Sequence, residues 1–178
     1  MNTLKDEILR DIASGTRRLV SEFGSSLYTL ALDLCENSAD AEDLTFRTFE
    51  RAVEKIEQFD PSRDMFPWLC GILVNFRKMN LRKKGANALV FDEELIEIKH
   101  EAPSPDDILV RRQDASVVQA AVRVLPPGLK EVVVLRYYED MSIESVAGIL
   151  KLPAGTVKSR LHLARKMLKR KLSRTFLR

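Results

Sequence analysis

The sequence predicts an all-α protein: two small helical domains joined by a flexible linker, the C-terminal domain being a helix-turn-helix. Apolar residues recur at helical spacing along nearly the whole chain, and no segment alternates as a hairpin strand does. Glycine, proline and polar residues gather between 85 and 105 beside an acidic run, a composition typical of linkers. A chain of 178 residues is long enough for two small domains, with cores that need neither disulfides nor metals. We therefore expect domains at 1–84 and 106–178 and a linker at 85–105.

Two amphipathic helices are predicted in the first domain. Residues 39–57 place apolar side chains on one side with charged residues between them: Leu44, Phe49, Val53 and Ile56. Residues 66–84 repeat this pattern with Leu69, Ile72, Leu73 and Phe76. Pro67 falls in the first turn of the second helix, where its missing N–H costs little.

The second domain has the sequence of a helix-turn-helix. The run from Val132 to Leu135 has strand-like composition, but its place between two prolines and a helical pattern favours a helix. Ser142 is suited to cap a short helix with an apolar face. Residues 151–153 form the predicted turn, and a longer helix starts at about Ala154.

The longer helix has two distinct faces. One is an apolar stripe: Val157, Leu161, Ala164, Leu168 and Leu172. The other carries Lys158, Ser159, His162, Lys166 and Lys169, with Arg165 at its flank. A buried seam opposite a basic face is typical of a recognition helix in the DNA major groove. The alternative is an ordinary amphipathic surface helix.

Helix 66–84 carries a second stripe beside its apolar face. Trp68, Asn75 and Arg82 are seven residues apart, and Lys78 lies between the last two. A ring, an amide and two cations can stack on an unpaired base, hydrogen-bond its edge and hold phosphates. Trp68 is equally compatible with a core position. Phe59 is compatible with a core position or with a pocket for an extruded base.

The charge is unevenly distributed along the chain. The net charge of +3 consists of −1 in residues 1–84, −4 in 85–124 and +8 in 125–178, and Glu144 is the last acid. A second basic cluster closes the first domain: Arg77, Lys78, Arg82, Lys83 and Lys84. Two basic patches separated by an acidic segment indicate a bipartite polyanion binder, with a merely solvated surface as the alternative. In the free chain, the acidic linker and the basic C-terminal face are expected to draw the domains together.

Several function classes are disfavoured. No stretch approaches the length of a membrane span, and the N-terminus lacks a secretory pattern, so we expect a cytoplasmic protein without membrane insertion. The sequence has no phosphate-binding loop and no HExxH or GxSxG motif. Cys35, Cys70, His100 and His162 are too scattered for a metal cluster, and the thiols are expected to be structural. We expect no enzyme, no cofactor and no metal.

Two groups of motifs resemble a known family. Residues 40–45, Phe49, 56–60, 66–72 and Asn75 resemble the second conserved region of bacterial RNA polymerase sigma factors of the extracytoplasmic-function (ECF) subgroup. Residues 125–137, 142–150, 155–161 and 164–165 resemble the fourth region of that subgroup. The resemblance covers about residues 25–84 and 106–172, with matching order and spacing.

The resemblance implies a dissociable subunit that gives RNA polymerase core its promoter specificity and helps to open DNA. Residues 39–57 would dock on the clamp coiled coil of the polymerase, and the flap would be a second contact. The implied core-polymerase contacts are Asp40, Asp43, Leu44, Phe46 and Arg47. The implied −10 contacts, to duplex and single-stranded promoter DNA, are Arg51, Phe59, Trp68, Asn75, Lys78 and Arg82. The implied −35 contacts are Arg136, Lys158, Ser159, His162 and Arg165.

The sequence departs from the family pattern at a few positions. Phe46 and Arg47 stand where glutamine and an acid are usual, Met79 replaces a common aspartate, and Leu163 replaces a usual arginine. We therefore expect an apolar anchor at Phe46 and a different −35 preference. Relatives are commonly held inactive by an anti-sigma protein, which is an expected partner here. Rival interpretations are a response-regulator-type transcription factor, an enzyme and a bare protein-interaction module.

Overall fold

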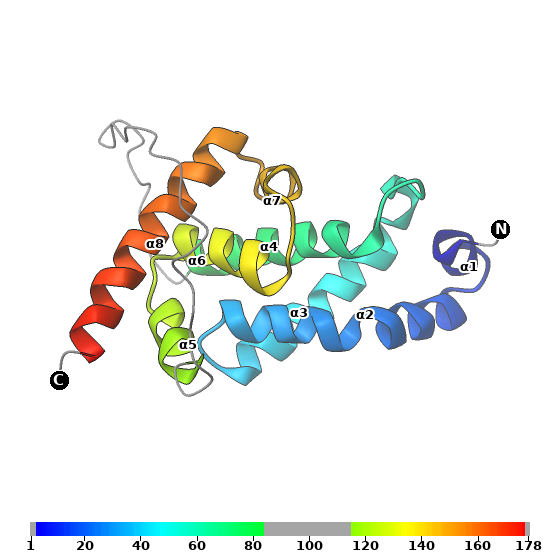
Figure 1. Cartoon of the computed structure of the whole chain (residues 1–178). Coiled ribbons are helices and arrows are strands. Elements are labelled where there is room, and N and C mark those ends of the chain that lie inside the picture. The colour runs from blue at the N-terminus through cyan, green and yellow to red at the C-terminus, as the bar shows by residue number, and fades with distance from the viewer. Residues whose placement is uncertain (1–2, 84–114, 177–178) are drawn as a thin grey trace.

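A computed structural model of the chain describes residues 3–83 and 115–176, and every regular element in these two ranges is helical (Figure 1). The first range contains α1 (Leu4–Arg10), α2 (Ile12–Leu34), α3 (Ser38–Glu54), the 3₁₀ turn η1 (Ile56–Gln58) and α4 (Met65–Lys83). The second contains α5 (Ala115–Arg123), α6 (Pro127–Val133), the π-helical turn η5 (Val134–Tyr138), α7 (Ile143–Leu150) and α8 (Ala154–Phe176). The all-α prediction is confirmed, whereas the predicted linker 85–105 lies outside the described residues.

The first domain packs α2, α3 and α4 around one core, with α1 folded back on the start of α2. Asp11 caps α2 by accepting hydrogen bonds from the N–H groups of Ala13 and Ser14, and Asn37 caps α3 through the N–H of Asp40. At Gly15 a Cβ would lie 2.5 Å from the Cα of Ile8. The close crossing of α1 and α2 therefore depends on the missing side chain. The two helices predicted in this domain correspond to α3 with η1 and to α4.

The second domain contains the predicted helix-turn-helix. Pro127 occupies the start of α6, and the run 132–135 is helical, as its setting indicated. Ser142 caps α7 by accepting a hydrogen bond from the N–H of Ser145, as predicted. Lys151 then ends α7 in the left-handed conformation at φ 56°, which turns the chain into α8.

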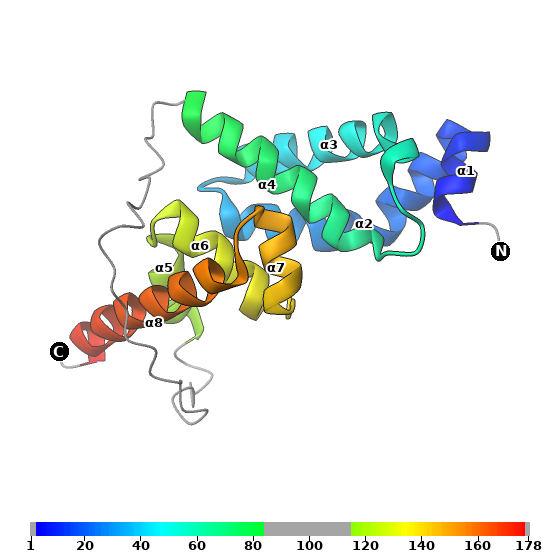
Figure 2. The same ribbon diagram turned by 90° about the horizontal axis from the view of Figure 1, so that it is seen from above.

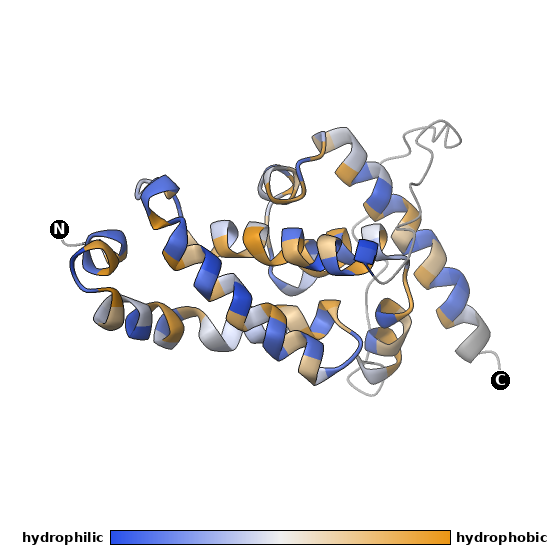
Figure 3. Cartoon of the chain, turned by 180° about the vertical axis from the view of Figure 1, so that it is seen from behind, coloured by the Kyte–Doolittle hydropathy of each residue, from blue (hydrophilic) through white to orange (hydrophobic). Residues whose placement is uncertain are grey.

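Helix α8 is amphipathic along its length, and blue and orange residues alternate along it in Figure 3. Val157, Leu161 and Ala164 are buried against α6 and α7, while Leu168 and Leu172 farther along the predicted stripe are half-buried. The apolar stripe therefore forms the core of this domain in its first half and becomes more exposed toward the C-terminus.

The two domains contact each other directly. Helix α4 lies beside α7 in Figures 1 and 2, and α2 touches η5. The sequence predicted a contact through the acidic linker and the basic C-terminal face, and that linker lies outside the described residues. Within the described residues the contact involves α4 and α2 of the first domain, with α6, η5 and α7 of the second.

Candidate nucleic-acid interface

The basic face of α8 lies opposite its buried stripe. Lys158 is exposed near the start of the helix, and Ser159, His162 and Arg165 are half-buried beside it. The Arg165 Nε donates to the carbonyl of Leu161 at 3.4 Å, along the same helix. The structure thus brings four of the five predicted −35 residues onto one side of one helix, a surface suited to the phosphates and base edges of a groove.

The fifth predicted −35 residue, Arg136, lies in η5 before the helix-turn-helix. Its Nη1 donates to the Asp140 carboxylate at 3.3 Å and to the Met141 carbonyl at 3.1 Å. The guanidinium also lies 5.9 Å from the centre of the Tyr137 ring. Arg136 therefore braces the loop into α7, while its guanidinium stays partly exposed.

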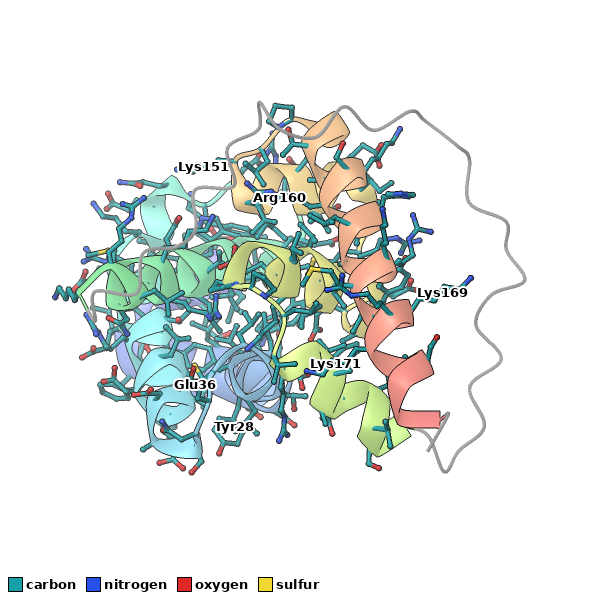
Figure 4. All side chains as sticks on the ribbon, turned by 90° about the vertical axis from the view of Figure 1, so that its left-hand side faces the viewer. Tyr28, Glu36, Lys151, Arg160, Lys169 and Lys171 are labelled. Carbon is teal, nitrogen blue, oxygen red and sulfur yellow. The ribbon has the colours of Figure 1, made fainter. Side chains whose placement is uncertain are left out.

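Cations elsewhere on α8 point in different directions. A Cβ at Gly128 would lie 3.3 Å from the Arg160 Nη1, so this guanidinium lies over the start of α6. In Figure 4 the Lys169 side chain points away from the other helices. Lys171 lines a groove between α5 and α8, whose floor is mainly apolar: Ala121, Val124, Leu125, Met167 and Leu168, with Arg170 also at the edge.

The predicted −10 stripe on α4 is only partly exposed. Asn75 and Arg82 are exposed, and Trp68 is half-buried against the core. Phe59 is 6% exposed, and its ring centre lies 5.1 Å from that of Trp68 at an interplanar angle of 48°. Of the two alternatives for Phe59, the structure shows the core position and not an open base pocket. A contact between Phe59 and DNA stays a prediction.

Lys78, in the middle of the stripe, is engaged by the second domain. Its Nζ donates to the Leu150 carbonyl at 3.4 Å and lies 3.9 Å from the Glu131 Oε2. Arg77, which belongs to the basic cluster that closes the first domain, is buried. Its Nη1 forms a 2.7 Å ion pair with the Glu131 Oε1, and its Nε donates to the Leu34 carbonyl at 3.0 Å. Arg77 is therefore withdrawn from the surface of the basic cluster, because it pairs with an acid of the second domain.

Glu131 is the acid at the centre of this contact, and sequence reasoning missed it. Its side chain is 3% exposed and that of Arg77 is 7% exposed. Burial raises the pKa of Glu131, against the opposing charges of Arg77, Lys78 and Arg160. The one sequence signal was its position: an acid inside the apolar run of α6 needs a buried partner.

The predicted polymerase-binding helix α3 separates into core and surface residues. Leu44 is 1% exposed and belongs to the core, whereas Phe46 is 64% exposed. The Arg47 Nη1 lies 3.5 Å from the Asp43 Oδ2, and its guanidinium stacks 4.9 Å from the centre of the Phe76 ring.

Asp40, predicted to contact polymerase, and Arg51, predicted to contact the −10 element, lie toward opposite ends of α3. Asp40 sits at the start, beside the capping Asn37. Arg51, predicted for the −10 element, pairs with Glu54 at 3.0 Å and lies 5.7 Å from the centre of the Phe76 ring. Arg47 and Arg51 therefore share one aromatic platform from α4.

Residues 3–83 and 115–176 hold no group of three metal-ligating side chains. Within the same ranges, no helix is long and apolar enough to cross a bilayer. The thiol of Cys70 is fully buried, and burial raises its pKa strongly.

Both halves of the chain match sequence families. Residues 19–87 match the family described as Sigma-70 region 2, and residues 116–168 match Sigma-70, region 4. The ECF RNA polymerase sigma factor SigW of Bacillus subtilis is 28% identical over 165 residues, covering 86% of this chain and 87% of the relative. The ECF RNA polymerase sigma factor SigE of Mycolicibacterium smegmatis is 32% identical over 152 residues, covering 85% of this chain and 59% of the relative.

Solved structures show the same fold. The sigma factor RpoE of Bartonella quintana, crystallised with the anti-sigma factor NepR, is 26% identical at a TM-score of 0.66 over 88% of this chain and 96% of that one. CnrH, solved with the cytosolic domain of CnrY, has a TM-score of 0.67 at 23% identity over 96% of this chain and 95% of that one. With regions 2 and 4 in the expected order on this helical fold, the chain belongs to the ECF RNA polymerase sigma factors, which recognise promoters and start transcription with RNA polymerase.

Proposed function

We propose that this chain reads the −35 element with α8 and the −10 element with α4 while bound to core RNA polymerase. The observation that carries the proposal is the basic face of α8: Lys158, Ser159, His162 and Arg165 lie together on the second helix of a helix-turn-helix. Arg136 would add a phosphate contact at the edge of this surface. The proposed units remain region 2 at 1–84, a linker at 85–105 and region 4 at 106–178.

Strand opening needs no catalytic group in this scheme. A protein that binds the unpaired strand better than the duplex shifts the opening equilibrium by its difference in affinity. Trp68 offers a ring for a displaced base, Asn75 an amide for its edge, and Lys78 and Arg82 cations for the backbone. Arg51 would add a further backbone contact, and Phe59 would support the Trp68 ring. We accordingly propose a non-enzymatic initiation factor.

Core polymerase would contact α3 through its exposed side chains. Phe46 is the proposed apolar anchor, with Asp43 and Arg47 around it and Asp40 at the helix start. Leu44 would act by holding α3 in shape. For the flap of the polymerase we propose the groove between α5 and α8, because it combines an apolar floor with basic edges.

The partner and the compartment follow from the same proposal. A protein that works with RNA polymerase and promoter DNA would act in the bacterial cytoplasm. One similar solved structure was crystallised with an anti-sigma factor. That observation supports an anti-sigma protein as the regulator of this chain as well.

The direct test is multi-round transcription with purified core polymerase on a genomic promoter library, with and without this chain. We expect defined start sites that share two upstream elements. Asn75→Ala should weaken selection at the downstream element only, and Lys158→Ala at the upstream element only. Start sites without shared elements would overturn the proposal, as would binding to duplex DNA with no dependence on core.

The flap contact has its own test. Val124 lines the groove and is 60% exposed, so Val124→Asp should leave the fold intact and weaken binding to core polymerase. Ala120→Asp, at an exposed position of the adjoining helix α5 outside the groove, is the control. Equal polymerase affinity of both variants, measured by fluorescence anisotropy, would exclude the groove as the contact.

A further inference from the structure

The contact between the two domains includes a charge, that of Lys78, which the proposed −10 surface would otherwise use. Arg77 and Lys78 lie on α4, the helix proposed for the −10 element, and both face Glu131 of α6. The Glu131 carboxylate is an anion that pairs with both cations, with one oxygen 2.7 Å from the Arg77 Nη1 and the other 3.9 Å from the Lys78 Nζ. The α4 cations are thus occupied from within the chain.

A second charge pairing supports the same interface. Lys130, next to Glu131, is buried and attracted by Glu36 of the α2–α3 turn, which is labelled in Figure 4. Burial lowers the pKa of Lys130, and the nearby Arg77 adds to this effect. Region 4 therefore presents one acid and one base side by side, and region 2 presents the complementary charges.

A hydrogen bond within region 2 orients Arg77 for its ion pair with Glu131. Arg77 donates to the Leu34 carbonyl within region 2, which holds its guanidinium in place for Glu131. Removing one partner of a buried ion pair leaves the other charge without compensation, which is far more costly than losing a surface pair. The closed arrangement should therefore depend steeply on Glu131, while each separated domain should not.

We infer that Glu131 is an intramolecular latch: in the free chain it docks region 4 onto the Arg77–Lys78 side of α4 and occupies Lys78 of the −10 surface until core polymerase separates the domains. The loss of Lys78 to DNA rests on the proposed role of this residue in DNA binding, whereas the docking itself does not. Any partner that holds the domains apart would release Lys78 without touching it.

The test compares Glu131→Ala with Glu144→Ala, which removes an exposed acid from the first turn of α7. Small-angle scattering of the free proteins should show a larger radius of gyration for Glu131→Ala only. A fluorescent single-stranded 15-mer oligonucleotide should bind Glu131→Ala about tenfold or more tightly than wild type, because an uncompensated buried charge shifts the population toward the open form. Lys78→Gln placed in the Glu131→Ala background should remove that gain.

Two further measurements separate the possible failures. Far-ultraviolet circular dichroism of Glu131→Ala should match that of the wild type, which distinguishes loss of the latch from loss of folding. With saturating core polymerase, Glu131→Ala should initiate transcription at the wild-type rate, because the domains are already apart. Unchanged compactness and oligonucleotide affinity in a folded Glu131→Ala variant would overturn the latch, even if the wild-type chain supports transcription.

Discussion

Two residues that lie two positions apart on α3 should have different roles, one in folding and the other in polymerase binding. Leu44 is 1% exposed, so Leu44→Ala removes buried methyl groups and leaves a cavity, at a cost of about 3 kcal/mol in the free energy of unfolding. Phe46 is 64% exposed, so Phe46→Ala should change that free energy by less than about 0.5 kcal/mol. The two variants therefore separate folding from contact.

The magnitude for Phe46 follows from its exposed surface. A phenylalanine side chain can bury about 150–250 Å², so roughly 100 Å² remains available, worth about 2.5 kcal/mol at 25 cal/mol/Å². If polymerase covers this surface, Phe46→Ala should weaken the affinity for core roughly 60-fold. Urea unfolding of the free protein and fluorescence anisotropy with labelled protein and core polymerase measure the two quantities.

Ile12 on α2 supplies the matched control, since it is also 64% exposed but lies outside α3. Ile12→Ala should leave both stability and polymerase affinity unchanged. Wild-type affinity in Phe46→Ala would refute the assignment of this residue as the anchor. Loss of affinity in Leu44→Ala with unchanged stability would refute the placement of Leu44 in the core.

Three other predictions concern DNA, pH and packing. Lys158→Ala should lower the slope of log affinity against log salt by about 1 for −35 duplex bound to holoenzyme, and an unchanged slope would remove Lys158 from the phosphate contacts. Burial raises the pKa of Asp33, which lies beside Gln119 and Arg123. Burial also raises the pKa of Glu139, and the nearby charge of Asp33 adds to this shift. Because both carboxyl groups lie between the domains, the closed form binds protons more tightly than the open form and is favoured as pH falls from 7 toward about 5. Small-angle scattering at pH 5 and 8 tests this, and expansion at the lower pH would contradict it. Gly15→Ala should lower the melting temperature, because the new Cβ would meet the backbone of α1 at 2.5 Å, and a wild-type melting temperature would show that the crossing can relax.

The elements that the sequence predicted well depend on local chemistry. The cap at Ser142, the turn at residues 151–153 and the stripe of α8 follow from side-chain type and spacing, and the structure confirms each. Leu44 and Phe46 lie two residues apart on an amphipathic helix, so periodicity alone separates core from surface there. The function class could also be predicted from the sequence, because both halves of the chain carry motifs of the sigma factor family.

What the sequence could not predict is which charges meet across domains. Arg77 and Lys78 are adjacent cations in one basic cluster, and nothing in their spacing shows that one is buried and the other half-buried. Their partner Glu131 is 54 residues from Arg77 along the chain. The choice between the core and pocket alternatives for Phe59 likewise required the position of Trp68 in three dimensions.

The central claim is that this chain, with core polymerase, opens promoter DNA by holding the unpaired strand on α4. Permanganate oxidation of unpaired thymines on a selected promoter tests this most directly. We predict reactive thymines around the −10 element only when the chain and core polymerase are both present, and weaker reactivity with Trp68→Ala or Asn75→Ala. Equal reactivity with core polymerase alone, or full reactivity in both variants, would contradict the account.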